Sequence, residues 1–199
     1  MWFGQPNHTY DFDKLSGGFT IRRARAGEKF ETLDAQVRTL SPEDLLIDDE
    51  NGPVGLAGVM GGAATEISDT TTNVLVEAAN WDPITIARTA RRHKLWSEAA
   101  RRYERGVDPQ VAAAGVARVV QLLEQLGGGT ADALGTTIDN STAPAPIDLP
   151  DGYVAKIIGV EFTADEITGA LTEIGTTIVP VAGGLTVTPP TWRPDLTDK

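Results

Sequence analysis

Short apolar segments separated by polar turn sequences fill the chain from residue 19 to residue 79. The segments 19–23, 45–47, 54–59 and 73–77 have the length and the alternating or β-branched apolar positions of strands. Asp49-Glu50-Asn51-Gly52 lies between the second and third of them and is typical of a turn. This part of the chain therefore predicts a mixed or antiparallel sheet.

The periodicity of the apolar positions changes after residue 80. Asp82-Pro83 combines a helix N-cap with proline at the first helical position, and residues 84–93 keep helical spacing. Asp108-Pro109 repeats this signal before a second apolar helix, which the glycines at 127–129 end. Strands followed by helices predict an α+β fold for the first module.

Residues 127–150 are rich in Gly, Thr, Ala and Pro and are interpreted as a linker or extended crossover. Beyond it, residues 153–158 predict a short helix. Thr163 and Glu166 form a capping box, which opens a helix through Ile174. Residues 177–179 and 185–188 predict a hairpin. Two short helices and a hairpin suggest a small winged-helix-like α+β module. We place the first module at residues 1–130, the linker at 131–146 and the second module at 147–199.

The composition of the 199 residues, 41% hydrophobic and 23% charged, is that of an ordinary globular protein. We expect no membrane span, because no run of eighteen apolar residues occurs. The absence of cysteine excludes disulfides, Cys-ligated zinc and a thiol nucleophile. The start, Met1 to Gly4, lacks the pattern of a signal peptide, and we expect a cytoplasmic protein. With a net charge of −11, RNA contact would require a local basic patch.

Two histidines occur in the chain. His8 lies in the polar, proline-containing stretch 4–11, which we do not expect in the core. A histidine can act as a general acid or base near neutral pH, or orient a water or a ribose hydroxyl. Local sequence alone favours a turn histidine bonded to backbone. His93, between Arg92 and Lys94, is predicted to be a solvated helix end.

The glycines of Gly58-Val59-Met60-Gly61-Gly62 permit positive φ and close approach of a ligand to the backbone. No Lys-Ser/Thr follows, so the cluster is not a P-loop, and a structural turn fits at least as well. Glu77 ends an apolar run. If that strand is buried, its carboxylate needs a partner, because an unpaired buried charge is costly. Alternation could equally place Glu77 on the solvent face, so both interpretations stay open.

Basic side chains outnumber acidic ones between Asp82 and Asp108, which makes this segment the one RNA-facing candidate in an acidic chain. A solvated, salt-bridged helix face is the simpler interpretation, and charge count alone favours it. The candidate RNA contacts are Arg88, Arg91, Arg92, Arg101, Arg102 and Arg105.

None of these patterns identifies a reaction, because they hold no Ser/His/Asp arrangement and no His-rich metal spacing. In sequence order, however, they resemble the bacterial phenylalanyl-tRNA synthetase β-subunit family. The matching segments are spread over nearly the whole chain and include GQPNHTYD at 4–11, LAGVMGG at 56–62, TNVLVE at 72–77, IARTARR at 86–92, RYERGVDP at 102–109 and TPPTWRPD at 188–195.

The resemblance implies that residues 1 to about 130 form an editing module that hydrolyses tyrosine wrongly attached to tRNA(Phe). It implies a helix-turn-helix-like second module and an α2β2 tetramer whose α subunit joins phenylalanine to tRNA using ATP and magnesium. A pocket shaped for phenylalanine rejects an analogue with one extra hydroxyl only about a hundredfold. A second site that hydrogen-bonds the hydroxyl discriminates more strongly between tyrosine and phenylalanine, because phenylalanine leaves the polar group of that site unpaired.

The resemblance also assigns residues. Glu77 matches the family's phenol-binding glutamate. His8 matches the histidine near the scissile ester and the terminal ribose, where it would be the catalytic residue that positions the tRNA end or a water. Gly61, with Ala57 and Gly58, would shape the pocket wall and supply backbone N–H groups.

Two further pocket positions depart from the family pattern. Ser97 and Ala99 stand where threonine and alanine are usual, and the family's His-Thr-Asp-Ala-Ser reads Trp-Ser-Glu-Ala-Ala at residues 96–100. The local shape of the pocket is therefore expected to differ.

The resemblance places the family's Thr-Asn-Tyr segment before this chain and its acidic magnesium run after it. Asp195 matches the first acidic position, a partial site whose other ligands lie beyond the chain end. Since magnesium needs several oxygen ligands, we expect no metal or other cofactor bound to this fragment. The alternative function is a non-catalytic RNA-binding or architectural module of the synthetase.

Overall fold

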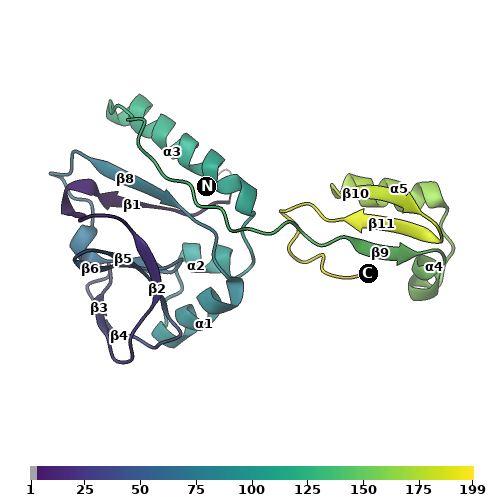
Figure 1. Cartoon of the computed structure of the whole chain (residues 1–199), viewed down its shortest axis with the longest axis horizontal. Coiled ribbons are helices and arrows are strands. Elements are labelled where there is room, and N and C mark those ends of the chain that lie inside the picture. Colours follow the sequence, from purple (N-terminus) through teal and green to yellow (C-terminus); the bar gives the residue numbers. More distant parts are fainter. Residues whose placement is uncertain (1–3) are drawn as a thin grey trace. The chain divides into compact units, whose positions relative to one another are not determined.

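A computed structural model of the protein describes residues 4–199 (Figure 1). The first three residues, on which the expected absence of a signal peptide partly rests, lie outside the described residues. The chain forms two compact units, Met1–Gly135 and Thr136–Lys199. Both combine helices with antiparallel strands, which confirms the predicted α+β class.

The first unit contains a four-stranded antiparallel sheet in the order β2-β5-β6-β7. Its strands are β2 (Thr20–Arg23), β5 (Leu45–Asp49), β6 (Gly52–Leu56) and β7 (Met60–Gly61). The predicted turn at residues 49–52 is confirmed and joins β5 and β6 as a hairpin, in which the Asp49 carboxylate accepts from the backbone N–H groups of Asn51 and Gly52. β6 ends before the predicted residue 59, since Gly58 adopts φ 67° in a tight turn. A separate hairpin joins β3 (Lys29–Glu31) to β4 (Val37–Thr39).

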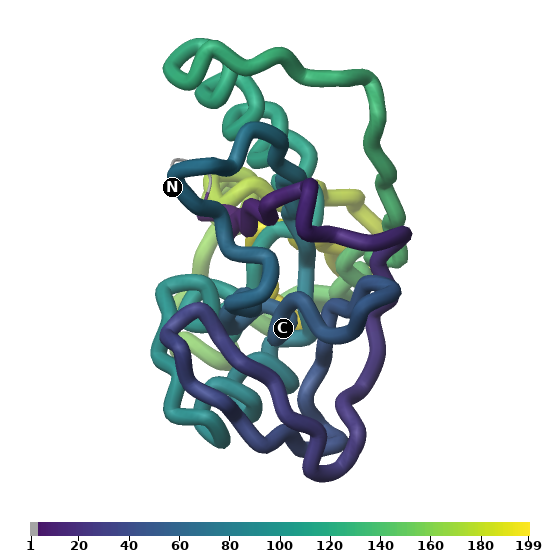
Figure 2. Tube along the Cα trace, turned by 90° about the vertical axis from the view of Figure 1, so that its left-hand side faces the viewer, coloured from purple at the N-terminus to yellow at the C-terminus, as the bar shows by residue number. Residues whose placement is uncertain are grey.

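A second, two-stranded ribbon pairs segments far apart in the sequence. β1 (Asn7–Asp11) runs antiparallel to β8 (Val74–Ala78), with His8 opposite Glu77 and Tyr10 opposite Leu75. Side chains alternate between the faces of a strand, so these four share one face of the ribbon. Helix α3 (Ala112–Gly127) packs along β8 (Figure 1). Figure 2 follows the trace of this unit from the purple N-terminal strand to the teal helices.

Helix α1 begins at its predicted cap, whereas the predicted cap Asp108 begins a 3₁₀ turn and not α3 itself. The Asp82 carboxylate accepts from Thr85 N at 2.7 Å and opens α1 (Pro83–His93); such a cap contributes about 1 kcal/mol. Asp108 caps a short 3₁₀ turn (Pro109–Val111) that leads into α3, and Gly128 with φ 68° ends α3 as predicted. Helix α2 (Glu98–Tyr103), begun by Ser97, is an additional element that the sequence pattern did not reveal.

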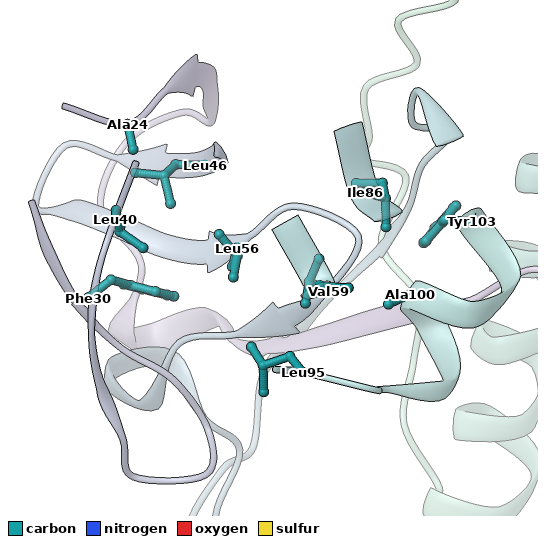
Figure 3. Close-up of a cluster of buried hydrophobic side chains, with 11 residues drawn as sticks. Ala24, Phe30, Leu40, Leu46, Leu56, Val59, Ile86, Leu95, Ala100 and Tyr103 are labelled. Carbon is teal, nitrogen blue, oxygen red and sulfur yellow. The ribbon is translucent and has the colours of Figure 1, made fainter. Parts of the chain in front are cut away.

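The main hydrophobic core of the first unit lies between the sheet and the helices. Figure 3 shows side chains from the strands and from α1 and α2 converging on one another. The buried members are Ala24, Phe30, Leu40, Leu46, Leu56, Val59, Ile86, Ala90, Leu95, Ala100 and Tyr103. A second cluster of Tyr10, Ile47, Val54 and Ala57 fills the space between the ribbon and the sheet. Each large apolar side chain buried in this way contributes about 1.5–3 kcal/mol.

The second unit is a three-stranded antiparallel sheet with two helices. Its elements are β9 (Ile147–Pro150), α4 (Tyr153–Ile158), α5 (Ala164–Glu173), β10 (Thr177–Val181) and β11 (Gly184–Thr188), with the strand order β10-β11-β9. The predicted capping box is present, because Thr163 and Glu166 satisfy each other's backbone N–H groups. The two helices and the hairpin β10–β11 are confirmed, whereas β9 was not predicted. Within residues 4–199, no helix has both the length and the apolar character needed to cross a membrane.

Candidate functional site

The ribbon β1–β8 brings a carboxylate, an imidazole and a phenol onto one face. Glu77 Oε2 accepts a hydrogen bond of 2.5 Å from the hydroxyl of Tyr10, whose side chain is fully buried. This contact resolves the question that the sequence left open for Glu77: its side chain is half-buried and has a partner. The polar stretch 4–11 was not expected in the core, and that expectation is wrong for Tyr10 and Gln5, which are 0% and 6% exposed.

The environment of this pair shifts the pKa of both groups. Burial raises the pKa of the Glu77 carboxyl above 4.5, and the hydrogen bond from Tyr10 opposes that rise. Burial and the nearby carboxylate raise the pKa of Tyr10, so its hydroxyl stays a donor. Within the described part of the chain, Glu77 is therefore a poorly solvated carboxylate with one donor, which makes a further donor favourable.

The His8 ring lies between the Tyr10 ring and the backbone of β7. The centroids of His8 and Tyr10 are 4.4 Å apart in an edge-to-face arrangement. A Cβ at Gly61 would lie 2.3 Å from His8 Cε1, so only glycine leaves room for the imidazole. Burial lowers the pKa of His8, and the neutral ring can accept a proton. The prediction of a turn histidine is wrong, because His8 lies within a strand.

Ala57 and Gly58 lie in the same region but serve packing. Ala57 is 1% exposed and belongs to the Tyr10 cluster. Gly58 has φ 67°, and a Cβ there would come within 2.8 Å of both Ile86 and Trp81. Gly58 therefore forms a structural turn, one of the alternatives that the sequence allowed, and Gly61 makes room for the His8 ring. The assignment of Ala57, Gly58 and Gly61 to a substrate pocket stays a prediction.

Ser97 and Ala99 lie next to the main core rather than on the ribbon. Ser97 Oγ donates to the carbonyl of Val59 at 2.7 Å and accepts from Ala100 N, so it caps α2. Ala99 packs against the core cluster. The two clusters share Trp81. The assignment of Ser97 and Ala99 to the pocket stays a prediction.

Tyr10 is the residue of this site that sequence reasoning missed. Two-residue spacing between His8 and Tyr10, and between Leu75 and Glu77, was visible in the sequence. The register that brings these pairs onto one face was not visible, because it depends on a contact between residues 67 positions apart.

Several candidate RNA-binding arginines are ion-paired with neighbouring acids. Arg92 binds both Asp44 and Glu43, Arg102 lies 3.1 Å from Glu98, and Arg91 lies 4.0 Å from Glu104. The arginines whose side chains are exposed in this segment include Arg88, Arg101 and Arg105. Their role in binding RNA stays a prediction.

His93 is not the solvated helix end that the sequence predicted. Its side chain is 6% exposed, and its Nε2 lies 2.7 Å from an oxygen of Asp44, which is fully buried. The prediction is wrong because the C-terminal turn of α1 packs onto the loop before β5, a contact that basic flanking residues do not reveal.

Two shallow cavities occur elsewhere in the first unit. One of about 400 Å³ is lined by Lys29, Phe30, Glu31, Pro53, Ala63 and Ala64. The other, of about 230 Å³, is lined by Arg23, Pro42, Glu43, Thr85 and Arg88. Neither is lined by His8 or Glu77, so the site on the ribbon rests on the chemistry of its side chains.

The residues around Asp195 do not fit a magnesium site within this chain. Both Asp195 oxygens accept from Arg193, at 2.8 and 2.7 Å. In the described part of the chain, no three His, Cys, Asp or Glu side chains are grouped as metal ligands. The match of Asp195 to a magnesium position stays a prediction.

Comparison with known proteins divides the chain into two matched segments. Residues 1–128 match the family model of the B3/4 domain, and residues 147–199 match that of the tRNA synthetase B5 domain. The phenylalanine–tRNA ligase beta subunit of Leifsonia xyli subsp. xyli is 64% identical over 196 residues, which cover 98% of this chain and 23% of that protein. The corresponding subunit of Streptomyces avermitilis is 52% identical over 198 residues, covering 98% of this chain and 24% of that protein.

Among solved structures, an N-terminal fragment of the phenylalanyl-tRNA synthetase beta subunit from Pyrococcus horikoshii matches with a TM-score of 0.44 and 15% identity. The match covers 96% of this chain and 55% of that fragment. The chain spans about a quarter of the length of the curated relatives that it matches.

Proposed function

Because the chain belongs to the phenylalanine–tRNA ligase β-subunit family, with a B3/4 domain followed by a B5 domain, we propose that its first unit hydrolyses tyrosine wrongly joined to tRNA(Phe). The substrate is the ester between the tyrosyl carbonyl and the terminal ribose. In this proposal the unit supports ATP- and magnesium-dependent synthesis of Phe-tRNA by an α2β2 enzyme, whose α subunit and tRNA are its partners.

The observation that carries the proposal is the phenol hydrogen bond on a half-buried carboxylate. Glu77 already accepts a phenol O–H at 2.5 Å, from Tyr10. The same carboxylate can accept the hydroxyl of a tyrosyl ester, whereas a phenylalanyl ester offers no donor and still displaces water from it. Selection by a buried acceptor distinguishes the two amino acids in the direction that proofreading requires.

His8 supplies the second part of the chemistry. Its neutral imidazole lies directly opposite Glu77 on the ribbon. A neutral imidazole can take a proton from a water molecule while the water oxygen bonds to the ester carbonyl carbon. The bond to the ribose oxygen then breaks, and that oxygen receives the proton. General base catalysis of this kind contributes about 10²- to 10⁴-fold.

The substitution Glu77→Ala in the complete synthetase tests the proposal. Loss of a hydrogen bond to a charged acceptor should lower the ratio of Tyr-tRNA to Phe-tRNA hydrolysis about ten- to hundredfold. Both esters are assayed as purified aminoacyl-tRNA, with spontaneous hydrolysis subtracted. Glu66→Ala removes an exposed glutamate and should leave the ratio unchanged.

A ratio that survives Glu77→Ala would reject Glu77 as the selector. The remaining function would then be RNA binding or architecture, which the exposed Arg88, Arg101 and Arg105 favour. Such binding would weaken with added salt, because each phosphate contact releases counterions.

A further inference from the structure

The phenol that occupies Glu77 in this structure belongs to the protein itself. Tyr10 lies on β1, two residues from His8 on the same face, and donates to Oε2 of Glu77. The other oxygen, Oε1, accepts from no residue between 4 and 199, and it is not one of the buried unpaired side-chain atoms. Among residues 4–199, Glu77 therefore has one oxygen with a protein donor and one without.

Tyr10 is held in place and cannot give way to a substrate. It is 0% exposed and packs with Ile47, Val54 and Ala57 between the ribbon and the sheet. Its ring also lies 5.1 Å from that of Phe19. Moving the phenol out would open the second core cluster, so a tyrosyl substrate must use the free oxygen.

We propose that Tyr10 is a positioning residue for Glu77: its hydroxyl permanently occupies one carboxylate oxygen, so that Glu77 stays an oriented acceptor and offers its other oxygen to a substrate phenol. This inference rests on the proposed proofreading function. It assigns to the site two phenols on one carboxylate, one from the protein and one from the substrate.

The electrostatic surroundings show why a resident donor matters. Burial raises the pKa of Glu77, and the Tyr10 hydroxyl opposes that rise by bonding to the charged form. The titratable groups facing Glu77 are His8 and Tyr10 on β1 and Tyr103 on α2, whose pKa its charge helps to raise. Helix α3, which packs on β8, carries Arg118 and Glu124. Without the Tyr10 hydroxyl, Glu77 would protonate at a higher pH and lose its strength as an acceptor.

The pH dependence of discrimination tests this role. The ratio of Tyr-tRNA to Phe-tRNA hydrolysis is measured from pH 4.5 to 8 with the complete synthetase and with its Tyr10→Phe variant. Titration of His8 affects both esters and cancels in the ratio, which isolates Glu77. We expect the ratio to fall at acid pH, where Glu77 becomes protonated, and we call this fall the acid limb. In Tyr10→Phe the acid limb should move up by about one pH unit. Between the wild-type limb and the shifted limb, the variant should discriminate up to roughly tenfold less than wild type.

Tyr103→Phe is the matched control. It also removes a buried phenol hydroxyl, one that donates to the carbonyls of Ala79 and Pro6 and not to Glu77. The control should leave the acid limb in place. A limb that moves equally in both variants, or in neither, would overturn the inference.

A second variant keeps the shape of the site. Replacing Tyr10 by 3-fluorotyrosine gives a more acidic phenol and a stronger donor, so the limb should move to lower pH, opposite to Tyr10→Phe. This measurement tests the role of Tyr10 even if Tyr10→Phe fails to fold. If Glu77→Ala abolishes discrimination while both Tyr10 changes leave the limb unmoved, the proofreading proposal stands and the role of Tyr10 is rejected.

Discussion

Two carboxylates in the first unit lie beside a histidine, and their surroundings differ in the number of donors. Asp44, in the loop before β5, is 0% exposed and accepts from Ser41 N, His93 Nε2 and Arg92. Glu77, on the ribbon, has a single donor among residues 4–199, namely Tyr10.

The pKa of each carboxyl group follows from that difference. Burial would raise the pKa of Asp44, but the bond from His93, the bond from Ser41 and the charge of Arg92 outweigh it, and the pKa falls. The pKa of Glu77 rises, because one donor does not offset its burial. A satisfied carboxylate fixes a loop to a helix, whereas an incompletely satisfied one is available to a ligand.

The largest effect that separates the two sites is expected on stability. Asp44→Ala should lower the free energy of unfolding of the first unit by about 3–5 kcal/mol, because Arg92 and His93 lose their buried partner. Urea denaturation measures the loss, and the exposed Asp69→Ala is the control. A loss below about 1 kcal/mol, the size of a surface ion pair, would contradict the assignment of Asp44 as a structural tether.

The second effect concerns how each histidine is held. His93 is fixed by its bond to Asp44, whereas His8 is positioned by packing on Gly61. Gly61→Ala should displace the His8 ring and slow Tyr-tRNA hydrolysis roughly ten- to hundredfold. The cost in stability should be about 1 kcal/mol. Gly18→Ala, which meets open space, serves as control; full activity in Gly61→Ala would show that the site does not depend on this contact.

The smallest expected effect is a difference between the two carboxylates in the sign of their contribution to the pH dependence of stability. Asp44, with a folded pKa below 3.8, contributes stability that is lost as pH falls through that lower value. Glu77, with a folded pKa above 4.5, contributes stability that is present at low pH and lost as pH rises above 4.5.

Relative to wild type, Asp44→Asn should therefore become more costly as pH rises from 3 to 4, and Glu77→Gln less costly from 4.5 to 7. Each change should be on the order of 1 kcal/mol. Unfolding midpoints in urea across this range measure both changes. The same sign for the two variants would remove the distinction between the sites.

Elements set by local signals could be predicted from the sequence. Asp82 and Thr163 begin helices because their side chains bond backbone N–H groups three residues away. The turn at Asp49 follows from a similar local bond. β1 could not be predicted, because its strand character comes from pairing with β8 and not from its own polar sequence.

In the candidate site, too, contacts between residues distant in sequence could not be predicted. Glu77 and His8 were assigned by resemblance, and the sequence pattern alone left both open. Tyr10 and the burial of His93 were missed because each depends on a partner far along the chain, Glu77 in one case and Asp44 in the other. Pattern and capping identify elements, but they do not specify which side chains meet across them.

The closure of β1 on β8 makes the site a late product of synthesis on the ribosome. The Tyr10–Glu77 contact spans 67 residues, so the sheet between the two strands can form while the phenol still has no acceptor. Contacts this distant in sequence slow folding, because a long loop must close before they form. A nascent chain stalled before β8 would thus hold the hairpins and one strand of the proposed site, with the Tyr10 hydroxyl still lacking its acceptor.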